Sequence, residues 1–273
     1  MATERRPPAE RVRDRLRRAA GDPVAREMPA GYQRLGRVLL LRLPESMRPY
    51  YPVLGEAWRD TLGVRTVLVR VGPVEGELRR PQVETIAGDG TETAVVEHGV
   101  RWRFDAARLM FAQGNRTERR RAGRLVRPGE VVADLFAGIG YFTIPVAVFG
   151  RPLRVVAVEK NPVAVRYLRE NAALNGVADR VEVLEGDNRS VGPPPGTVDR
   201  VFLGYLPSAV PWVPRAVELL RPRGGAVHVH AAVDARMPLE EAASLVAYVA
   251  SPLASAVTGA ALRIDGGVVK SAF

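Results

Sequence analysis

The second half of the chain alternates between hydrophobic runs and amphipathic segments. The runs are short and bounded by turn residues, which is typical of strands, whereas the segments between them repeat apolar residues at helical spacing. In the segment after residue 162, for example, Ala164, Leu168 and Ala172 share one face. This alternation predicts a doubly wound α/β sheet. The expected strands are 131–136, 154–159, 181–187, 200–204 and 225–230, and the expected helices are 143–149, 163–175 and 211–220.

The first half has a different pattern. Five short hydrophobic runs and one amphipathic stretch, 51–62, predict a small α+β domain over 31–105. Residues 1–30 are rich in Arg, Ala and Pro with only a thin apolar stripe, so we expect a basic, flexible arm there. The α/β domain follows over 106–233. The tail, 234–273, is expected to complete or replace the end of the sheet.

Composition excludes several classes of protein. The chain has 273 residues, of which 47% are hydrophobic, enough to bury a core. It has no cysteine and three histidines, so we expect no metal site. It has no run of 18 apolar residues and no apolar segment behind its basic start, so we expect no membrane span and a cytoplasmic protein.

The charge points to a polyanionic partner. The formal net charge is +10, and residues 101–127 hold nine arginines against Asp105 and Glu118. Clustered cations gain free energy by displacing counterions from phosphates, although a charge run can also be only a solvated face.

A glycine loop follows the first strand of the α/β domain. Gly138 and Gly140 lie two residues apart between that strand and the next helix, where glycine lets the backbone approach a ligand. A dinucleotide loop would have a third glycine at position 143, where this chain has threonine. The loop therefore suits a nucleoside without phosphates.

Two carboxylates end the next two strands. Glu159 lies about twenty residues after the glycines, where an acid can accept hydrogen bonds from ribose hydroxyls. Asp187 is placed for an adenine amino group. This order of motifs resembles that of the class I S-adenosylmethionine-dependent transferases, which implies a Rossmann-like catalytic sheet preceded by the small α+β domain. The resemblance implies S-adenosylmethionine as cofactor, bound by Asp134, Phe136, Ala137, Gly138, Gly140, Glu159, Lys160, Asn161, Asp187 and Asn188.

Segments outside the loop narrow the resemblance; they are 104–119, 134–143, 159–162, 175–180, 186–189 and 199–208. They are similar to segments of the tRNA 3-amino-3-carboxypropyltransferases of wybutosine synthesis, whose close relatives are the tRNA guanosine-37 N1-methyltransferases. Where the methyltransferases have Ser-Pro-Arg, this chain has Gln113-Gly114-Asn115. Where they have Asn-Leu-Pro, it has Tyr205-Leu206-Pro207. Both departures favour aminocarboxypropyl transfer.

The resemblance implies a reaction and a set of residues. The 3-amino-3-carboxypropyl group would move to 4-demethylwyosine at position 37 of tRNA-Phe, with release of methylthioadenosine. Arg119 is the candidate to hold the cofactor's carboxylate, with Asn115 as a second catalytic candidate. An exposed helix arginine or a tRNA phosphate contact is the alternative interpretation of Arg119. Arg116, Tyr205 and Pro207 are candidates for binding the tRNA substrate.

The acceptor and the oligomeric state stay open. A small phenol or amine could replace the tRNA base, the enzyme could be a guanosine-37 N1-methyltransferase, or the chain could bind RNA without turnover. His228 and His230 alternate on a strand and are expected to be core or cleft-floor residues. Trp212 is expected to pack, with a cap over the substrate cleft as its alternative role.

The tail departs from the wybutosine pattern. Residues 238–267 resemble the last helix and strand of short-chain dehydrogenases, but the dehydrogenase Tyr-x-x-x-Lys pair and glycine loop are missing from the chain. We therefore expect a divergent ending and no second activity.

Overall fold

The computed structural model describes residues 6–231 and 261–262. The chain divides into two compact units, which are described separately below. The N-terminal unit comprises the residues up to Val95 together with Arg103–Phe111. The C-terminal unit comprises Val96–Trp102 and the chain from Ala112 onward.

The N-terminal unit is a four-stranded mixed sheet with helices packed on it. The strand order is β1-β2-β3-β4, with β2 and β3 parallel and the two outer pairs antiparallel. Its core joins Leu39 and Val67 of the sheet to Leu54 and Trp58 of α3. The elements are α1 (Pro8–Ala20), α2 (Asp22–Glu27), β1 (Tyr32–Leu35), β2 (Val38–Leu41), η1 (Glu45–Tyr50), α3 (Tyr51–Leu62), β3 (Thr66–Arg70) and β4 (Val83–Gly88).

The expected flexible arm is instead part of this core. In α1, Val12 and Leu16 are fully buried, and Met28 after α2 is almost fully buried. The apolar stripe of α1 is thin, but its residues recur at four-residue spacing and contribute to the same hydrophobic core as α3. On its outer side, Arg15 pairs with Asp60 of α3 at 2.9 Å. The prediction for residues 6–30 was therefore wrong.

The residues of a hairpin, β5 (Glu92–Glu97) and β6 (Val100–Asp105), are divided between the two units. The sequence placed this hairpin wholly in the small domain, but its tip belongs to the C-terminal unit. The reason is a pair of hydrogen bonds: the Asn175 side chain accepts from the Arg101 amide at 2.9 Å and donates to the Arg101 carbonyl at 2.7 Å. The boundary expected at 105/106 is therefore not where the units divide.

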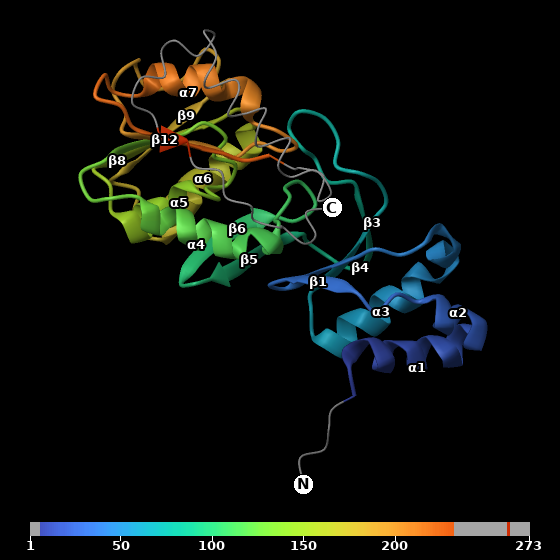
Figure 1. Ribbon diagram of the computed structural model, residues 1–273. Helices are drawn as coiled ribbons and strands as arrows, with labels where there is room; N and C mark the ends of the chain where they lie inside the picture. Colours follow the sequence, from blue (N-terminus) through green and yellow to red (C-terminus); the bar gives the residue numbers. More distant parts are fainter. Residues whose placement is uncertain (1–5, 232–260, 263–273) are drawn as a thin grey trace. The chain divides into compact units, whose positions relative to one another are not determined.

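The C-terminal unit contains a six-stranded sheet of order β12-β11-β10-β7-β8-β9, in which all neighbours are parallel (Figure 1). This confirms the doubly wound sheet predicted from the alternation. Strand order reverses between β7 and β10, so ligands are expected at the carboxyl ends there. The strands are β7 (Val131–Asp134), β8 (Arg154–Glu159), β9 (Val181–Glu185), β10 (Arg200–Leu203), β11 (Ala226–Val229) and β12 (Ala261–Leu262).

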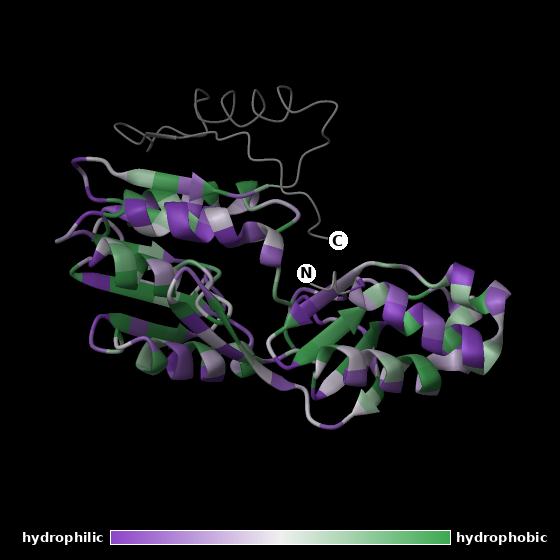
Figure 2. Cartoon of the chain, turned by 90° about the horizontal axis from the view of Figure 1, so that it is seen from below, coloured by the Kyte–Doolittle hydropathy of each residue, from purple (hydrophilic) through white to green (hydrophobic). Residues whose placement is uncertain are grey.

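The strands of this sheet are strongly hydrophobic and its helices are amphipathic, as Figure 2 shows. The expected helix at 143–149 is a short α-helix followed by a π-helical turn, and the one at 211–220 is a 3-10 turn followed by α7. The elements are η2 (Gln113–Asn115), α4 (Arg116–Leu125), α5 (Thr143–Pro145), η3 (Val146–Gly150), α6 (Pro162–Leu174), η4 (Val210–Trp212) and α7 (Val213–Leu219).

The tail contributes one strand to the sheet. Ala261 and Leu262 of β12 pair in parallel with Ala226 and Val227 of β11. That the tail as a whole completes or replaces the end of the sheet stays a prediction. The rest of the dehydrogenase-like segment lies outside the described residues.

Candidate functional site

Asp134 holds the glycine loop from within. It is buried at the end of β7, and its carboxylate accepts hydrogen bonds from the Thr143 amide at 3.1 Å, the Thr143 hydroxyl at 2.7 Å and the Phe136 amide at 3.3 Å. Burial raises the pKa of Asp134 to about 6, against the opposing effect of these donors. Asp134 thus lies beside the glycine loop, and its side chain accepts hydrogen bonds from the loop and from Thr143.

Glu159 connects β8 to the glycine loop. One carboxylate oxygen accepts from the Gly138 amide and the other from the Asn161 amide, both at 2.7 Å. Burial raises the pKa of Glu159. Gly140 adopts a φ of 99°, and a Cβ there would lie 2.4 Å from Ile144, so only glycine fits. The structure therefore brings Gly138, Glu159 and Asn161 together at the glycine loop.

Other hydrogen bonds fix the remaining loop backbone. Ala137 donates to the Val158 carbonyl at 3.0 Å and accepts from the Gly140 amide at 2.8 Å. The Asn188 side chain donates to the Leu135 carbonyl at 2.7 Å. Asn171 of α6 donates likewise to Ile139 at 3.0 Å. The loop is thus held in one shape by side chains from several elements. Sequence reasoning missed Asn171, because a polar residue on a helix carries no sign of a partner 32 residues away.

The ends of β8 and β9 also meet. Lys160 pairs with Asp187 at 3.2 Å, and Arg189 contacts the same carboxylate at 2.9 Å. The Arg189 hydrogen bond holds the pKa of Asp187 well below its usual range. Asn161 caps α6 by accepting from the Val163 amide at 3.0 Å. The predicted residues of these two strand ends are therefore neighbours, as expected.

Three aromatic rings gather beside the loop, at the ends of β7 and β10. The Phe136 ring lies 5.1 Å from both Tyr205 and Trp212, and the latter two are 5.3 Å apart. All three are partly exposed. Pro207 is exposed after a cis peptide bond with Leu206. This aromatic cluster extends the candidate site toward Trp212, which sequence reasoning had mainly assigned to packing.

The structure contradicts the sequence-based role of Arg119. Its side chain is 3% exposed; Nε and Nη2 donate to Glu97 at 3.1 and 2.5 Å, and Nη1 donates to the Ala112 carbonyl at 3.0 Å. It also lies over the Trp102 ring, 5.6 Å from the centroid. A guanidinium committed to a buried carboxylate is not available to hold a cofactor carboxylate. The alternative of an exposed arginine or phosphate contact is excluded as well.

The segment around Arg119 presents other groups to the same edge of the sheet. Asn115 ends η2, and Arg116 begins α4 with its side chain exposed. Glu118 contacts Arg121 at 2.7 Å and His230 at 3.5 Å. Burial would raise the pKa of Glu118, but hydrogen bonds from His230 and Arg121 lower it to about 2. His230 stacks on Phe142 at 4.7 Å, which supports the cleft-floor interpretation.

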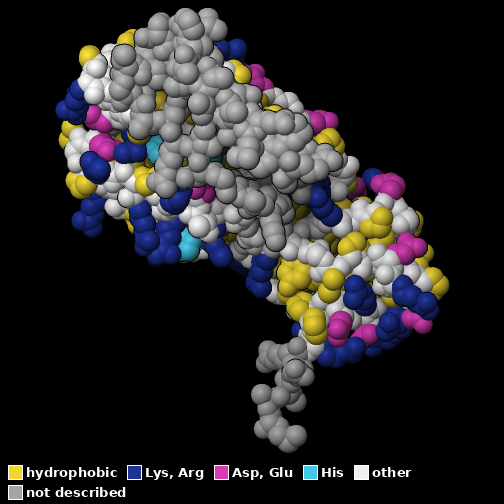
Figure 3. Space-filling view, viewed as in Figure 1, with side chains coloured by type: hydrophobic (Ala, Val, Ile, Leu, Met, Phe, Trp, Pro, Cys, Tyr) yellow, Lys and Arg dark blue, Asp and Glu magenta, His cyan; other side chains and the backbone are white. Residues whose placement is uncertain are grey.

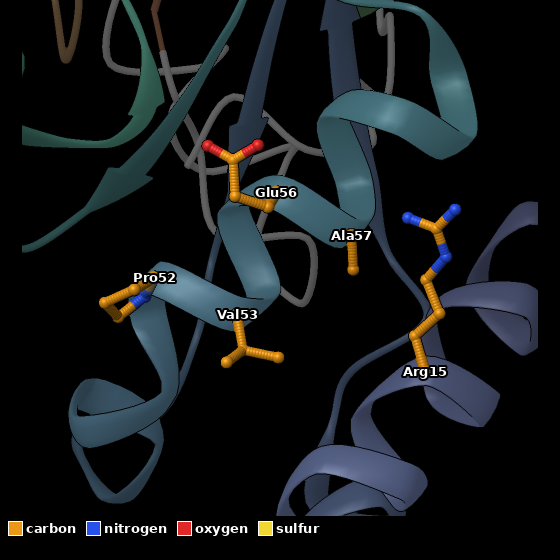
Figure 4. A pocket seen from close by; sticks show the side chains of 5 residues that line it. All are labelled: Arg15, Pro52, Val53, Glu56 and Ala57. Atoms are coloured by element: carbon orange, nitrogen blue, oxygen red, sulfur yellow. The ribbon is translucent and has the colours of Figure 1, made fainter.

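The described residues hold no group of three or more His, Asp or Glu side chains that could bind a metal ion. No helix among them is both long and apolar enough to cross a membrane. A hollow of about 440 Å³ lies in the N-terminal unit between α1 and α3, with Arg15 and Glu56 beside Val53 (Figure 4). None of the predicted site residues lines it.

Two known domain families match the chain. The TRM5/TYW2 methyltransferase domain matches residues 93–258, and the TYW2 N-terminal domain matches residues 12–91. Their border agrees with the structural division near the hairpin. The second match includes most of α1, in line with its place in the core.

Individual relatives support the same family assignment. The tRNA(Phe) (4-demethylwyosine(37)-C(7)) aminocarboxypropyltransferase of Pyrococcus horikoshii is 36% identical over 231 residues, which cover 84% of this chain and 82% of the relative. The crystal structure of P. horikoshii TYW2 in complex with MeSAdo superposes with a TM-score of 0.77 and 32% identity, covering 89% of this chain and 87% of that one. Trm5b from Pyrococcus abyssi gives a TM-score of 0.68 and 30% identity, covering 82% and 68%. The chain therefore belongs to the TRM5/TYW2 family.

Proposed function

We propose that this protein transfers the 3-amino-3-carboxypropyl group of S-adenosylmethionine to 4-demethylwyosine at position 37 of tRNA-Phe, releasing methylthioadenosine. The observation that carries the proposal is the match of the N-terminal unit to a domain named for TYW2, the TYW2 N-terminal domain. The relative of the same name and the TYW2 structure with MeSAdo support it. A cytoplasmic location is part of the proposal, because the substrate is tRNA.

The glycine loop fits the adenosine part of this cofactor. The backbone amides of Gly138, Asn161 and Lys160 donate to the Glu159 carboxylate, which offers about four acceptor positions, so an acceptor position remains for a ribose hydroxyl. The loop has threonine in place of a third glycine, as a ligand without a diphosphate allows. When bound, S-adenosylmethionine supplies the electrophilic carbon and the sulfonium leaving group.

The protein's contribution is orientation. In this reaction the acceptor ring would form a carbon–carbon bond to the γ-carbon of the methionine part of S-adenosylmethionine. The bond between that carbon and sulfur would break with its electron pair on sulfur, and the acceptor ring carbon would lose a proton. Phe136 joins the loop to Tyr205 and Trp212, so a planar acceptor stacked on this cluster would lie beside the cofactor. Holding the two reactants in line lowers the barrier without a strong base.

The test uses S-adenosylmethionine labelled in the carboxypropyl chain and tRNA-Phe that carries 4-demethylwyosine. We expect label in the tRNA with the wild-type protein. Glu159→Ala should lose cofactor affinity in calorimetry and transfer with it, because the ribose acceptor and the Gly138 brace disappear together. Glu182→Ala removes an exposed carboxylate from β9 and should leave both unchanged. Cofactor binding without any label in the tRNA would contradict the proposed acceptor.

A further inference from the structure

Helix α4 has two different faces. Its inner face buries Arg119, Ala122 and Gly123. The outer face carries Arg116, Arg120 and Arg124 at four-residue intervals, which places them within one quarter of the helix circumference. We call these three, with Arg127 just beyond the helix, the α4 arginine row. At about 1.5 Å per residue, the row extends roughly 12 Å along the helix from Arg116 to Arg124.

Within the part of the chain that the structure describes, no carboxylate pairs with the α4 arginine row. The only acid on the helix, Glu118, is committed to Arg121 and His230, and Glu97 is committed to Arg119. Figure 3 shows Lys and Arg side chains gathered at the lower left of the C-terminal unit, over α4 and the hairpin that Figure 1 labels β5 and β6. Among the described residues, the row is therefore a strip of positive charge without carboxylate partners.

Helix α1 shows that arginine content alone does not produce such a strip. It is also arginine-rich, yet Arg17 of α1 and Arg6 just before the helix both pair with Asp14 at 2.7 Å. Arg15 pairs with Asp60 on α3. Two arginines of α1 thus have carboxylate partners, whereas no described carboxylate pairs with the α4 arginine row.

The α4 arginine row begins at the edge of the sheet where the glycine loop lies, which we call the reactive edge. Glu118, in the first turn of α4, contacts His230, the residue that follows β11. His230 in turn stacks on Phe142 at the end of the glycine loop. Arg116 thus lies one turn from groups that adjoin the cofactor loop, and the row leads away from them.

We infer that the α4 arginine row binds the phosphates of the tRNA strand next to the acceptor base. The inference rests on the proposed function and adds the surface that positions the RNA. Guanidinium groups bind phosphate oxygens with two parallel hydrogen bonds, and such contacts fix the register of a nucleic acid without reading its sequence. Because the row starts at the reactive edge, it would hold the RNA strand that leads to the acceptor base.

The test is tRNA affinity as a function of salt for Arg120→Ala/Arg124→Ala. We expect affinity to fall on the order of tenfold at low salt, and the slope of log affinity against log salt to shrink by about one per arginine. The control is Arg154→Ala/Arg166→Ala, which removes the same charge from exposed arginines paired with Glu182 and Glu170. It should leave affinity and slope near the wild-type values.

Cofactor binding, followed by calorimetry, should be unchanged in both variants and shows that each is folded. An unchanged slope in Arg120→Ala/Arg124→Ala, or equal losses in both variants, would overturn the inference even if transfer to tRNA is intact. Conversely, wild-type protein that binds tRNA through the row and transfers nothing would overturn the proposed function and leave the surface standing. Absence of tRNA binding by the wild type would overturn both.

Discussion

Three charged residues, Asp134, Glu159 and Arg119, each form hydrogen bonds that hold the protein's own backbone or side chains in place. Asp134 and Glu159 were predicted from their places after strands, and both lie at the glycine loop. Both carboxylates accept hydrogen bonds from backbone amides of the loop, and the spacing of residues in the sequence does not predict these hydrogen bonds. Arg119 was misassigned because its partner Glu97 is 22 residues away on a hairpin, and a sequence pattern does not show which charges meet in the interior.

Asp134 should make stability depend on pH. Burial raises its pKa from 3.8 to about 6, so its contribution to stability is fully present below pH 4 and is lost as pH rises through 6. Relative to Asp134→Asn, which does not titrate, the wild type should lose on the order of 3 kcal/mol between pH 4 and pH 7. Urea unfolding of both proteins across this range measures the difference. A gap that grows in favour of the wild type with rising pH would contradict this environment for Asp134.

The Arg119–Glu97 pair should be structural. Arg119→Ala leaves the buried Glu97 carboxylate without its cation, which should cost about 3–5 kcal/mol. Arg154→Ala removes an exposed partner of Glu182 and should cost about 0–1 kcal/mol. Thermal unfolding compares the two. If Arg119→Ala has wild-type stability and specifically loses transfer, the original role as cofactor anchor is restored.

At the scale of elements, periodicity identified the strands of the C-terminal sheet and its helices other than α4 within a few residues. It failed for α1. Val12 and Leu16 are visible in the sequence as a thin stripe, but whether a stripe is covered depends on α3 and the sheet, which are distant in sequence. Periodicity also placed the hairpin tip in the wrong unit, because Asn175 holds it from 74 residues away.

The core role of α1 predicts a clear mutational effect. Leu16 is fully buried, so Leu16→Ala should destabilise the N-terminal unit by about 2–5 kcal/mol through lost burial and a cavity. Arg11→Ala on the exposed side of the same helix should change stability by less than about 0.5 kcal/mol. Denaturant unfolding followed by tryptophan fluorescence suits this test, since Trp58 lies in the same core. Equal stabilities of the two variants would mean that α1 does not belong to the core.

At the scale of the whole molecule, the strand-to-helix alternation and the three acidic strand ends were enough to predict a Rossmann-like cofactor sheet. The relatives then placed the chain in the TRM5/TYW2 family. Net charge predicted a polyanionic partner, but the sequence did not show where the charge is free. The ion pairs show this: Arg15 and Arg17 of α1 have carboxylate partners, whereas no described carboxylate pairs with the outer face of α4.

The proposed function depends on which carbon of S-adenosylmethionine the acceptor attacks. The most direct measurement is chromatography of the nucleoside product formed from S-adenosylmethionine in the presence of tRNA-Phe bearing 4-demethylwyosine. Attack at the γ-carbon predicts methylthioadenosine in an amount equal to the modified base. Adenosylhomocysteine as the product would show methyl transfer and contradict the proposed function.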